Sequence, residues 1–155
     1  MLKIKHCIFF SLSVKKEMTT KRSIGEKFVA RILDEYCVFY YQDYSFPDLK
    51  GVKNGYLRFD FCIPIRKQTS DGFEESYVSI EYNGIFHYHV IEGKTTMFTL
   101  AKQQMNDLIK TDYCKRKCLP LLWIPYWLNA KQVRKSIEEF LKKHVIVSNT
   151  GGCYG

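Results

Sequence analysis

The 155-residue sequence has no run of apolar residues that approaches the roughly 20 needed for a transmembrane helix. It also has no internal repeat and no low-complexity block, which excludes repeat architectures. Its six cysteines lack the paired CxxC spacing of common structural zinc sites, and they are scattered through a chain with enough apolar residues to fold without disulfides. We therefore expect an intracellular protein from a reducing compartment, without membrane contact.

The composition indicates one globular domain. With 46% hydrophobic and 26% charged residues, the chain can bury an ordinary core, which we expect over residues 19–147. Residues 1–18 are an N-terminal extension to which we assign no function, because their apolar run resembles a signal peptide while Met18 is an equally plausible start. Residues 148–155 are predicted to form a flexible tail.

The formal net charge of +8 and the pI near 9.1 favour an anionic partner. A basic surface gains affinity for nucleic acid because neutralising phosphates releases counterions. DNA or RNA fits this charge better than an acidic small molecule. Charge alone does not separate a nucleic-acid-binding protein from one that is merely basic, so the site residues have to decide.

Periodicity and turn residues predict an alternation of helices and strands. Ser23 and Glu26 have the spacing of a capping box, so a first helix is expected from Ser23 to about Tyr36. Further elements are expected as a short strand or strand entry at 38–41, a strand at 57–63 with one apolar face, a long hairpin turn at 66–75, a strand at 77–82, a connection at 89–99, a helix at 99–118, a strand at 119–126 and a helix capped by Asn129. A helix between the last two strands allows one parallel pairing. The predicted fold class is α/β, with a mixed, mostly antiparallel central sheet flanked by helices.

The helix expected at 99–118 carries two stripes of side chains at helical spacing. The apolar stripe is expected to face the core, and it consists of Ala101, Met105 and Leu108. The other stripe is polar, and its members are Gln103, Asp107, Lys110 and Cys114.

Two acidic residues in predicted strands are the strongest candidates for a functional site. Asp60 lies between Phe59 and Phe61, where a carboxylate costs stability unless it has a partner. Glu81 lies in the neighbouring strand, on the face opposite to Ile80. Two such carboxylates can converge on a Mg²⁺ ion and leave room for waters and a phosphate oxygen. Without a cation they would repel each other, and one would take up a proton.

Several motifs stand in order between about Ser23 and Trp127. They are Gly25-Glu26, Arg58-Phe59-Asp60-Phe61, Ile80-Glu81-Tyr82-Asn83-Gly84, Phe86-His87-Tyr88, Asp107 with Lys110 and Tyr113-Cys114, and Leu121-Leu122-Trp123-Ile124-Pro125-Tyr126. In this order they resemble the PD-(D/E)XK nuclease superfamily, and within it the phage and viral branch similar to very-short-patch-repair and homing-type endonucleases. The resemblance implies a restriction-endonuclease-like fold and metal-dependent hydrolysis of DNA.

The resemblance also implies roles for the matching acidic positions. Asp60 would be the central metal ligand, with Glu81 and Glu26 as further ligands for Mg²⁺, which Mn²⁺ can replace. The superfamily's lysine falls at Asn83, which carries no positive charge. The usual role of that lysine is therefore either absent or moved to another residue.

The related branch resembles a constellation of Glu, Asp, His and Asp. In this sequence Glu26, Asp60, His87 and Asp107 hold those positions, so His87 would act as general acid or base, since imidazole titrates near neutral pH. Lys110 would then help to hold the scissile phosphate. Four further basic residues are candidates for contact with the DNA backbone, namely Lys94, Lys115, Arg116 and Lys117.

Structural roles remain open for several of these residues. Glu26 is also the capping-box partner of its helix, and Arg58 is a possible salt-bridge partner of Asp60. Asp107 and Lys110 are three residues apart, which suits a helical ion pair. His87 could be a hydrogen-bonded histidine at a strand end. The basic run at 115–117 could be a solvated helix end.

Three function classes follow from these observations. The first is a DNA endonuclease in the cytoplasm of a bacterium or of a virus-infected host cell, possible as a homodimer because one small domain cannot make a concerted double-strand break. The second is a nucleic-acid-binding module of the same fold that lost its chemistry, for which Asn83 is the motivating feature. The third is a secreted or zinc-stabilised protein that uses Cys114 and Cys118 with His87 and His89.

Overall fold

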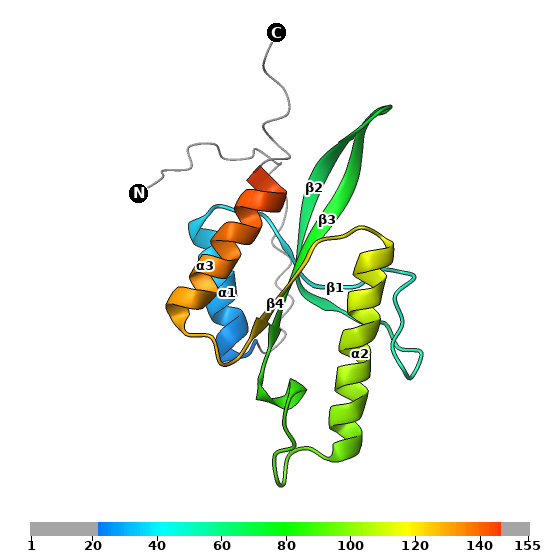
Figure 1. Cartoon of the computed structure of the whole chain (residues 1–155), viewed down its shortest axis with the longest axis vertical. Coiled ribbons are helices and arrows are strands. Elements are labelled where there is room, and N and C mark those ends of the chain that lie inside the picture. Colours follow the sequence, from blue (N-terminus) through cyan, green and yellow to red (C-terminus); the bar gives the residue numbers. More distant parts are fainter. Residues whose placement is uncertain (1–21, 147–155) are drawn as a thin grey trace.

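The computed structural model describes residues 22–146 as a mixed α/β fold. A four-stranded sheet in the order β1-β2-β3-β4 is covered by helices on both faces (Figure 1). The strands are β1 (Tyr41–Tyr44), β2 (Phe59–Thr69), β3 (Gly72–Asn83) and β4 (Leu121–Pro125). The helices are α1 (Ile24–Glu35), α2 (Met97–Arg116) and α3 (Ala130–Leu141), with a 3-10 turn η1 (Ile85–His87) after β3 and a π-helical turn η2 (Lys142–Ile146) after α3.

The pairing of the strands confirms the predicted fold class. β1 with β2 and β2 with β3 are antiparallel, whereas β3 and β4 are parallel and are joined through α2. The extension at 1–18 and the tail at 148–155 lie outside the described residues. In the part of the chain that is described, no helix has the length and apolar character needed to span a membrane.

Two apolar layers hold the helices to the sheet. α1 and α3 lie side by side over one face, and α2 covers the other (Figure 1). The larger layer includes Val29, Ile32, Leu33, Phe61, Ile63, Val78, Ile80, Ile124, Val133 and Ile137. The smaller layer, under α2, consists of Phe46, Leu49, Phe59, Cys62, Tyr113 and Cys114.

Each long helix begins at a side-chain cap. Ser23 Oγ accepts a hydrogen bond from the Glu26 N–H at 3.2 Å, and the Glu26 carboxylate accepts from the Ser23 N–H in return. Thr96 and Asn129 cap α2 and α3 in the same reciprocal way. These bonds satisfy N–H groups that have no partner within the helix. The predicted caps at Ser23 and Asn129 are confirmed.

The predicted long hairpin turn at 66–75 is wrong. β2 and β3 continue in register to Thr69 and Gly72, and only residues 70 and 71 remain as the turn. Gly72 has a φ of +127°, which suits glycine and lets the chain reverse tightly. The polar residues of this segment pair across the two strands, Arg66 with Glu75 and Lys67 with Glu74. A polar composition therefore marks an exposed, extended hairpin rather than a loop.

The prediction of one apolar face on the strand at 57–63 is also wrong. Phe61 and Ile63 pack under α1 and α3, but Phe59 and Cys62 are equally buried on the α2 side. Both faces of β2 are covered, so the strand has no solvent-facing side along this stretch. The first strand lies at Tyr41–Tyr44 rather than at 38–41.

The orientation predicted for α2 is inverted. Met105 and Leu108 of the supposed inner stripe are exposed, with Leu108 63% exposed. Lys110 and Cys114 of the polar stripe are buried instead, together with Tyr113. The helix thus turns its polar stripe toward the sheet, and the reason lies in what the sheet presents there.

Candidate active site

A buried ion pair joins the middle of α2 to β3. Lys110 Nζ lies 2.8 Å from Glu81 Oε1, and the two residues are 7% and 2% exposed. The ammonium also lies 5.3 Å from the centre of the Phe59 ring. Removing two charges from water is costly unless they meet in good geometry, so this contact explains why α2 turns a lysine inward.

Asp60 lies where the β2–β3 ladder ends. The regular register stops at the pair Phe61 and Ile80, which would place Asp60 opposite Glu81 if it continued. Instead Asp60 Oδ2 accepts a hydrogen bond from the backbone N–H of Tyr82 at 2.8 Å. The carboxylate therefore takes the place of a backbone acceptor at the point where the strands separate.

Burial and neighbouring carboxylates both disfavour negative charge at this junction. Burial raises the pKa of Asp60 to about 6, and the carboxylates of Glu26 and Asp43 add to the rise. Burial likewise raises the pKa of Glu81, against the opposing effect of Lys110, and Asp60 adds to that rise. One buried ammonium faces more than one carboxylate, which is the situation that an additional cation would relieve.

The position of Glu26 follows from a close approach of α1 to the sheet. A Cβ atom on Gly25 would come within 2.0 Å of the Tyr82 ring, so only glycine lets the helix start lie directly on that residue. This brings Glu26 close enough to act on the charge of Asp60. The Glu26 carboxylate also serves its own helix cap, which confirms the capping-box interpretation of this residue.

A histidine–aspartate pair lies beside the ion pair. His87 Nδ1, in η1, is 2.8 Å from Asp107 Oδ2 in α2, and the two side chains are 19% and 17% exposed. Gln103 Nε2 donates to the other oxygen of Asp107 at 3.1 Å, and Gln104 Nε2 donates to the His87 carbonyl at 3.3 Å. A carboxylate on Nδ1 orients the imidazole and leaves Nε2 for proton transfer. The expected pairing of Asp107 with Lys110 is therefore replaced by separate partners for each residue.

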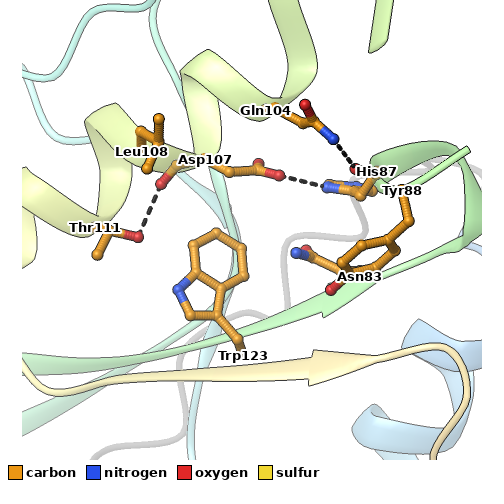
Figure 2. A pocket seen from close by; sticks show the side chains of 8 residues that line it. All are labelled: Asn83, His87, Tyr88, Gln104, Asp107, Leu108, Thr111 and Trp123. Atoms are coloured by element: carbon orange, nitrogen blue, oxygen red, sulfur yellow. Dashed lines mark hydrogen bonds and ion pairs between the residues drawn. The ribbon is translucent and has the colours of Figure 1, made fainter. Parts of the chain in front are cut away.

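A hollow of about 360 Å³ opens next to this pair (Figure 2). It is lined by Asn83, His87, Tyr88, Gln104, Asp107, Leu108, Thr111 and Trp123. Asn83 is 6% exposed, and its side-chain oxygen has no hydrogen-bond partner in the part of the chain that the structure describes. A buried acceptor without a donor costs stability, so this atom is one that a bound molecule would satisfy.

The residues present suit a Mg²⁺ ion with few protein ligands. Within residues 22–146, no three side chains among histidine, cysteine, aspartate and glutamate converge to hold a metal, so Glu26 does not join Asp60 and Glu81 as a third ligand. Mg²⁺ is commonly held by one or two carboxylates together with waters and substrate phosphates. Asp60 and Glu81 match that requirement, and burial raises the pKa of each carboxyl because it disfavours their negative charge.

The zinc alternative finds no support. Cys114 is buried and Cys118 is exposed beyond the end of α2, where it has a φ of 53°, so the two thiols do not share a helix face as expected. The four cysteines in the described part of the chain are free thiols. Cys7 and Cys153 lie outside the described residues.

The predicted DNA-contacting residues lie in three places, which are the buried ion pair, the segment between η1 and α2, and the end of α2. Lys110 is buried in the ion pair and is not a surface residue, whereas Lys94 is exposed between η1 and α2. The basic run lies at the end of α2, about 12 Å along the helix from Asp107. There Arg116 pairs with Asp112, and Lys117 pairs with Asp48 at 2.8 Å.

Sequence reasoning missed the walls of the hollow. Trp123 and Tyr88 stand out in the sequence only as parts of the matching motifs, and Gln104 and Thr111 belong to none of the predicted patterns. The placement of Trp123 follows from the parallel register, which sets it beside Glu81 on β4. No signal in a single sequence reveals that register, although the burial of Asn83 beside Glu81 follows from simple strand alternation.

Comparisons with known proteins give no basis for assigning a function to this chain. No protein-family model matches the chain, and neither the curated proteins nor the solved structures contain a significant match.

Proposed function

We propose that this chain is a metal-dependent DNA endonuclease that hydrolyses phosphodiester bonds, with a site of the PD-(D/E)XK kind. The observation that carries the proposal is the contact between Lys110 and Glu81. The superfamily pattern calls for a lysine at Asn83, and in its absence Lys110 brings an ammonium to the same carboxylate from α2. The lysine role is thus moved rather than lost.

Each residue has a task in this proposal. Asp60 and Glu81 would hold Mg²⁺, and when bound the ion supplies Lewis-acid stabilisation of the phosphate and lowers the pKa of a water. Lys110 would stabilise negative charge that develops on the phosphate, within a low-dielectric site where such an interaction is strong. His87, oriented by Asp107, would transfer a proton through Nε2 at an oxygen of the phosphodiester. The net positive charge of the chain favours the approach of DNA.

The test is cleavage of supercoiled plasmid with Mg²⁺ or Mn²⁺. Wild-type protein is expected to nick or linearise the plasmid, and Lys110→Met to lose at least about a hundredfold of the rate, the scale of losing one charge-stabilising group. Lys135→Met is the matched control, because it removes an exposed lysine from α3, on the other face of the sheet. Its rate should stay close to that of wild type.

A relocated lysine makes a sharper prediction. Because Asn83 and Glu81 point to the same side of β3, the double variant Asn83→Lys with Lys110→Met returns an ammonium to the strand position. We expect it to recover part of the activity that Lys110→Met loses. Cleavage by Lys110→Met at the wild-type rate would remove Lys110 from the mechanism.

A nucleic-acid-binding module without chemistry is the second candidate. The observation in its favour is that the site is internally paired, with Glu81 bound to Lys110 and Asp107 bound to both His87 and Gln103. This candidate predicts salt-sensitive DNA affinity and no cleavage in any divalent metal. Wild-type activity that disappears in Asp60→Asn would exclude it.

A further inference from the structure

The hollow beside the His87–Asp107 pair is built to receive a polar edge. Its wall includes the Asn83 amide, which is almost fully buried and whose oxygen has no donor among the described residues. The last torsion of an asparagine side chain is soft, so a small rotation directs the amide toward a bound group. Whatever fills the hollow should therefore offer an N–H or O–H hydrogen.

The occupant is not a metal ion. The hollow contains one carboxylate, Asp107, and both of its oxygens are already engaged, one by His87 and one by Gln103. A hard cation needs several oxygen ligands, and one neutral amide cannot replace them. The occupant is not a phosphate either, because no lysine or arginine is among the eight lining residues.

The remaining wall combines apolar side chains with Gln104 and Thr111, whose side chains already donate to the His87 and Asp107 carbonyls. Trp123 and Tyr88 line the hollow together with Leu108 (Figure 2). Tyr88 is held in place by Trp127, whose ring centre lies 4.7 Å away in an edge contact, whereas Trp123 has no ring contact within residues 22–146. An indole without a ring partner beside an unsatisfied amide suits a flat heterocycle with polar edges.

We propose that this hollow binds one unpaired nucleobase of the nucleic-acid substrate, stacked on Trp123 and hydrogen-bonded at its polar edge to Asn83. All four bases carry an N–H donor on the edge used for Watson–Crick pairing, so the site distinguishes unpaired from paired bases rather than one base from another. In a duplex those donors are already used. The inference rests on the proposed function for the identity of the polymer, and it adds a substrate class: strands with an unpaired or extruded nucleotide next to the scissile phosphate.

The location of the hollow supports this substrate class. Asn83 follows Glu81 by two residues on the same side of β3, and Asp107 precedes Lys110 by one turn of α2. A base held in the hollow therefore lies next to the carboxylate and the ammonium to which the cleavage step is assigned. Leu108 lines the hollow and Trp127 packs on Tyr88, and both apolar side chains are exposed, as expected for a surface that contacts bases.

The experiment is a binding comparison in EDTA, so that no cleavage occurs. A labelled ten-nucleotide single strand is compared by fluorescence anisotropy with a strand of equal charge in which every base is replaced by an abasic tetrahydrofuran unit. The base-containing strand should bind about tenfold more tightly, the scale of one stacked base. A ribonucleotide version of the same strand shows whether RNA bases enter as well as DNA bases.

Two variants locate the effect. Asn83→Leu and Trp123→Ala should each reduce the preference for bases, whereas Lys135→Met, the exposed control on α3, should preserve it. A second measurement needs no variant: the indole N–H signal of Trp123, one of two tryptophans, should shift in NMR spectra with the base-containing strand and not with the abasic strand.

Equal affinity for the two strands would overturn the inference, and so would a preference that survives both Asn83→Leu and Trp123→Ala. These outcomes are independent of cleavage. Base preference without cleavage in Mg²⁺ would refute the nuclease proposal alone, and cleavage without base preference would refute the base site alone.

Discussion

Replacing Asp60 by asparagine is expected to stabilise the metal-free protein above pH 6. Asparagine has the same shape, and its oxygen can still accept the hydrogen bond from the Tyr82 N–H. What disappears is the charge that burial disfavours. The variant therefore separates the energetic cost of a buried carboxylate from its proposed role in catalysis.

The magnitude follows from the pKa of Asp60. Its value rises from 3.8 to about 6, because burial favours the neutral form in the folded state. The stability gained from that neutral form is fully present below pH 3.8 and is lost as the pH rises through about 6. The complete loss corresponds to about 3 kcal/mol, and at pH 5 about half of it has occurred. Asp60→Asn should avoid this loss entirely.

The assay is urea unfolding of both proteins in EDTA at pH 5 and pH 8. The free energy of unfolding of Asp60→Asn should exceed that of wild type by up to about 3 kcal/mol at pH 8 and by about half as much at pH 5. Mg²⁺ at pH 8 should stabilise the wild type and leave the variant unchanged, because only the wild type keeps the ligand. A variant that is less stable than the wild type at pH 8 would refute the view that Asp60 is an uncompensated buried charge.

Two other substitutions test the fold around the site by chemical denaturation. Glu81→Leu should lower the free energy of unfolding by about 3–5 kcal/mol, because it leaves the Lys110 ammonium buried without a partner. A decrease below about 1 kcal/mol would mean that the ion pair is already solvated. Asn129→Ala should lower the free energy of unfolding by about 1 kcal/mol, because the α3 cap is lost. Asn129→Asp should keep most of the wild-type free energy of unfolding, since aspartate can also cap a helix. Equal decreases in the two variants would argue against the capping bond.

The sheet was predictable because its signals are local. Alternation along β3 placed Val78 and Ile80 against Glu81 and Asn83, and the structure has these pairs on opposite faces. The capping residues Ser23 and Asn129 marked the starts of α1 and α3 for the same reason, since each cap depends on residues three positions apart. The parallel pairing of β4 followed from the intervening helix alone.

The orientation of α2 was not predictable from its own amphipathicity. An apolar stripe predicts the buried side of a helix only when the surface beneath it is apolar. Here the sheet presents the buried Glu81, to which Lys110 of the polar stripe donates, so that stripe faces the sheet and the apolar residues Met105 and Leu108 remain exposed. The failure of the local rule coincides with the candidate site, as expected where function overrides packing.

The presence of an asparagine at position 83 and of the buried lysine at position 110 connects the proposed nuclease function with the proposed base-binding hollow. A lysine at position 83 would point to the same side of β3 as Glu81 and would occupy part of the hollow that Asn83 now lines. Supplying the ammonium from α2 keeps the contact with Glu81 at 2.8 Å and leaves a short amide in the wall instead of a long charged chain. The oxygen of that amide has no hydrogen-bond partner within residues 22–146, and the hollow that it lines is also lined by Trp123 and Tyr88. Under the two proposals, moving the lysine to the helix would account for the inverted face of α2, for the unsatisfied oxygen of Asn83, and for the room in which an unpaired base would lie beside the scissile phosphate.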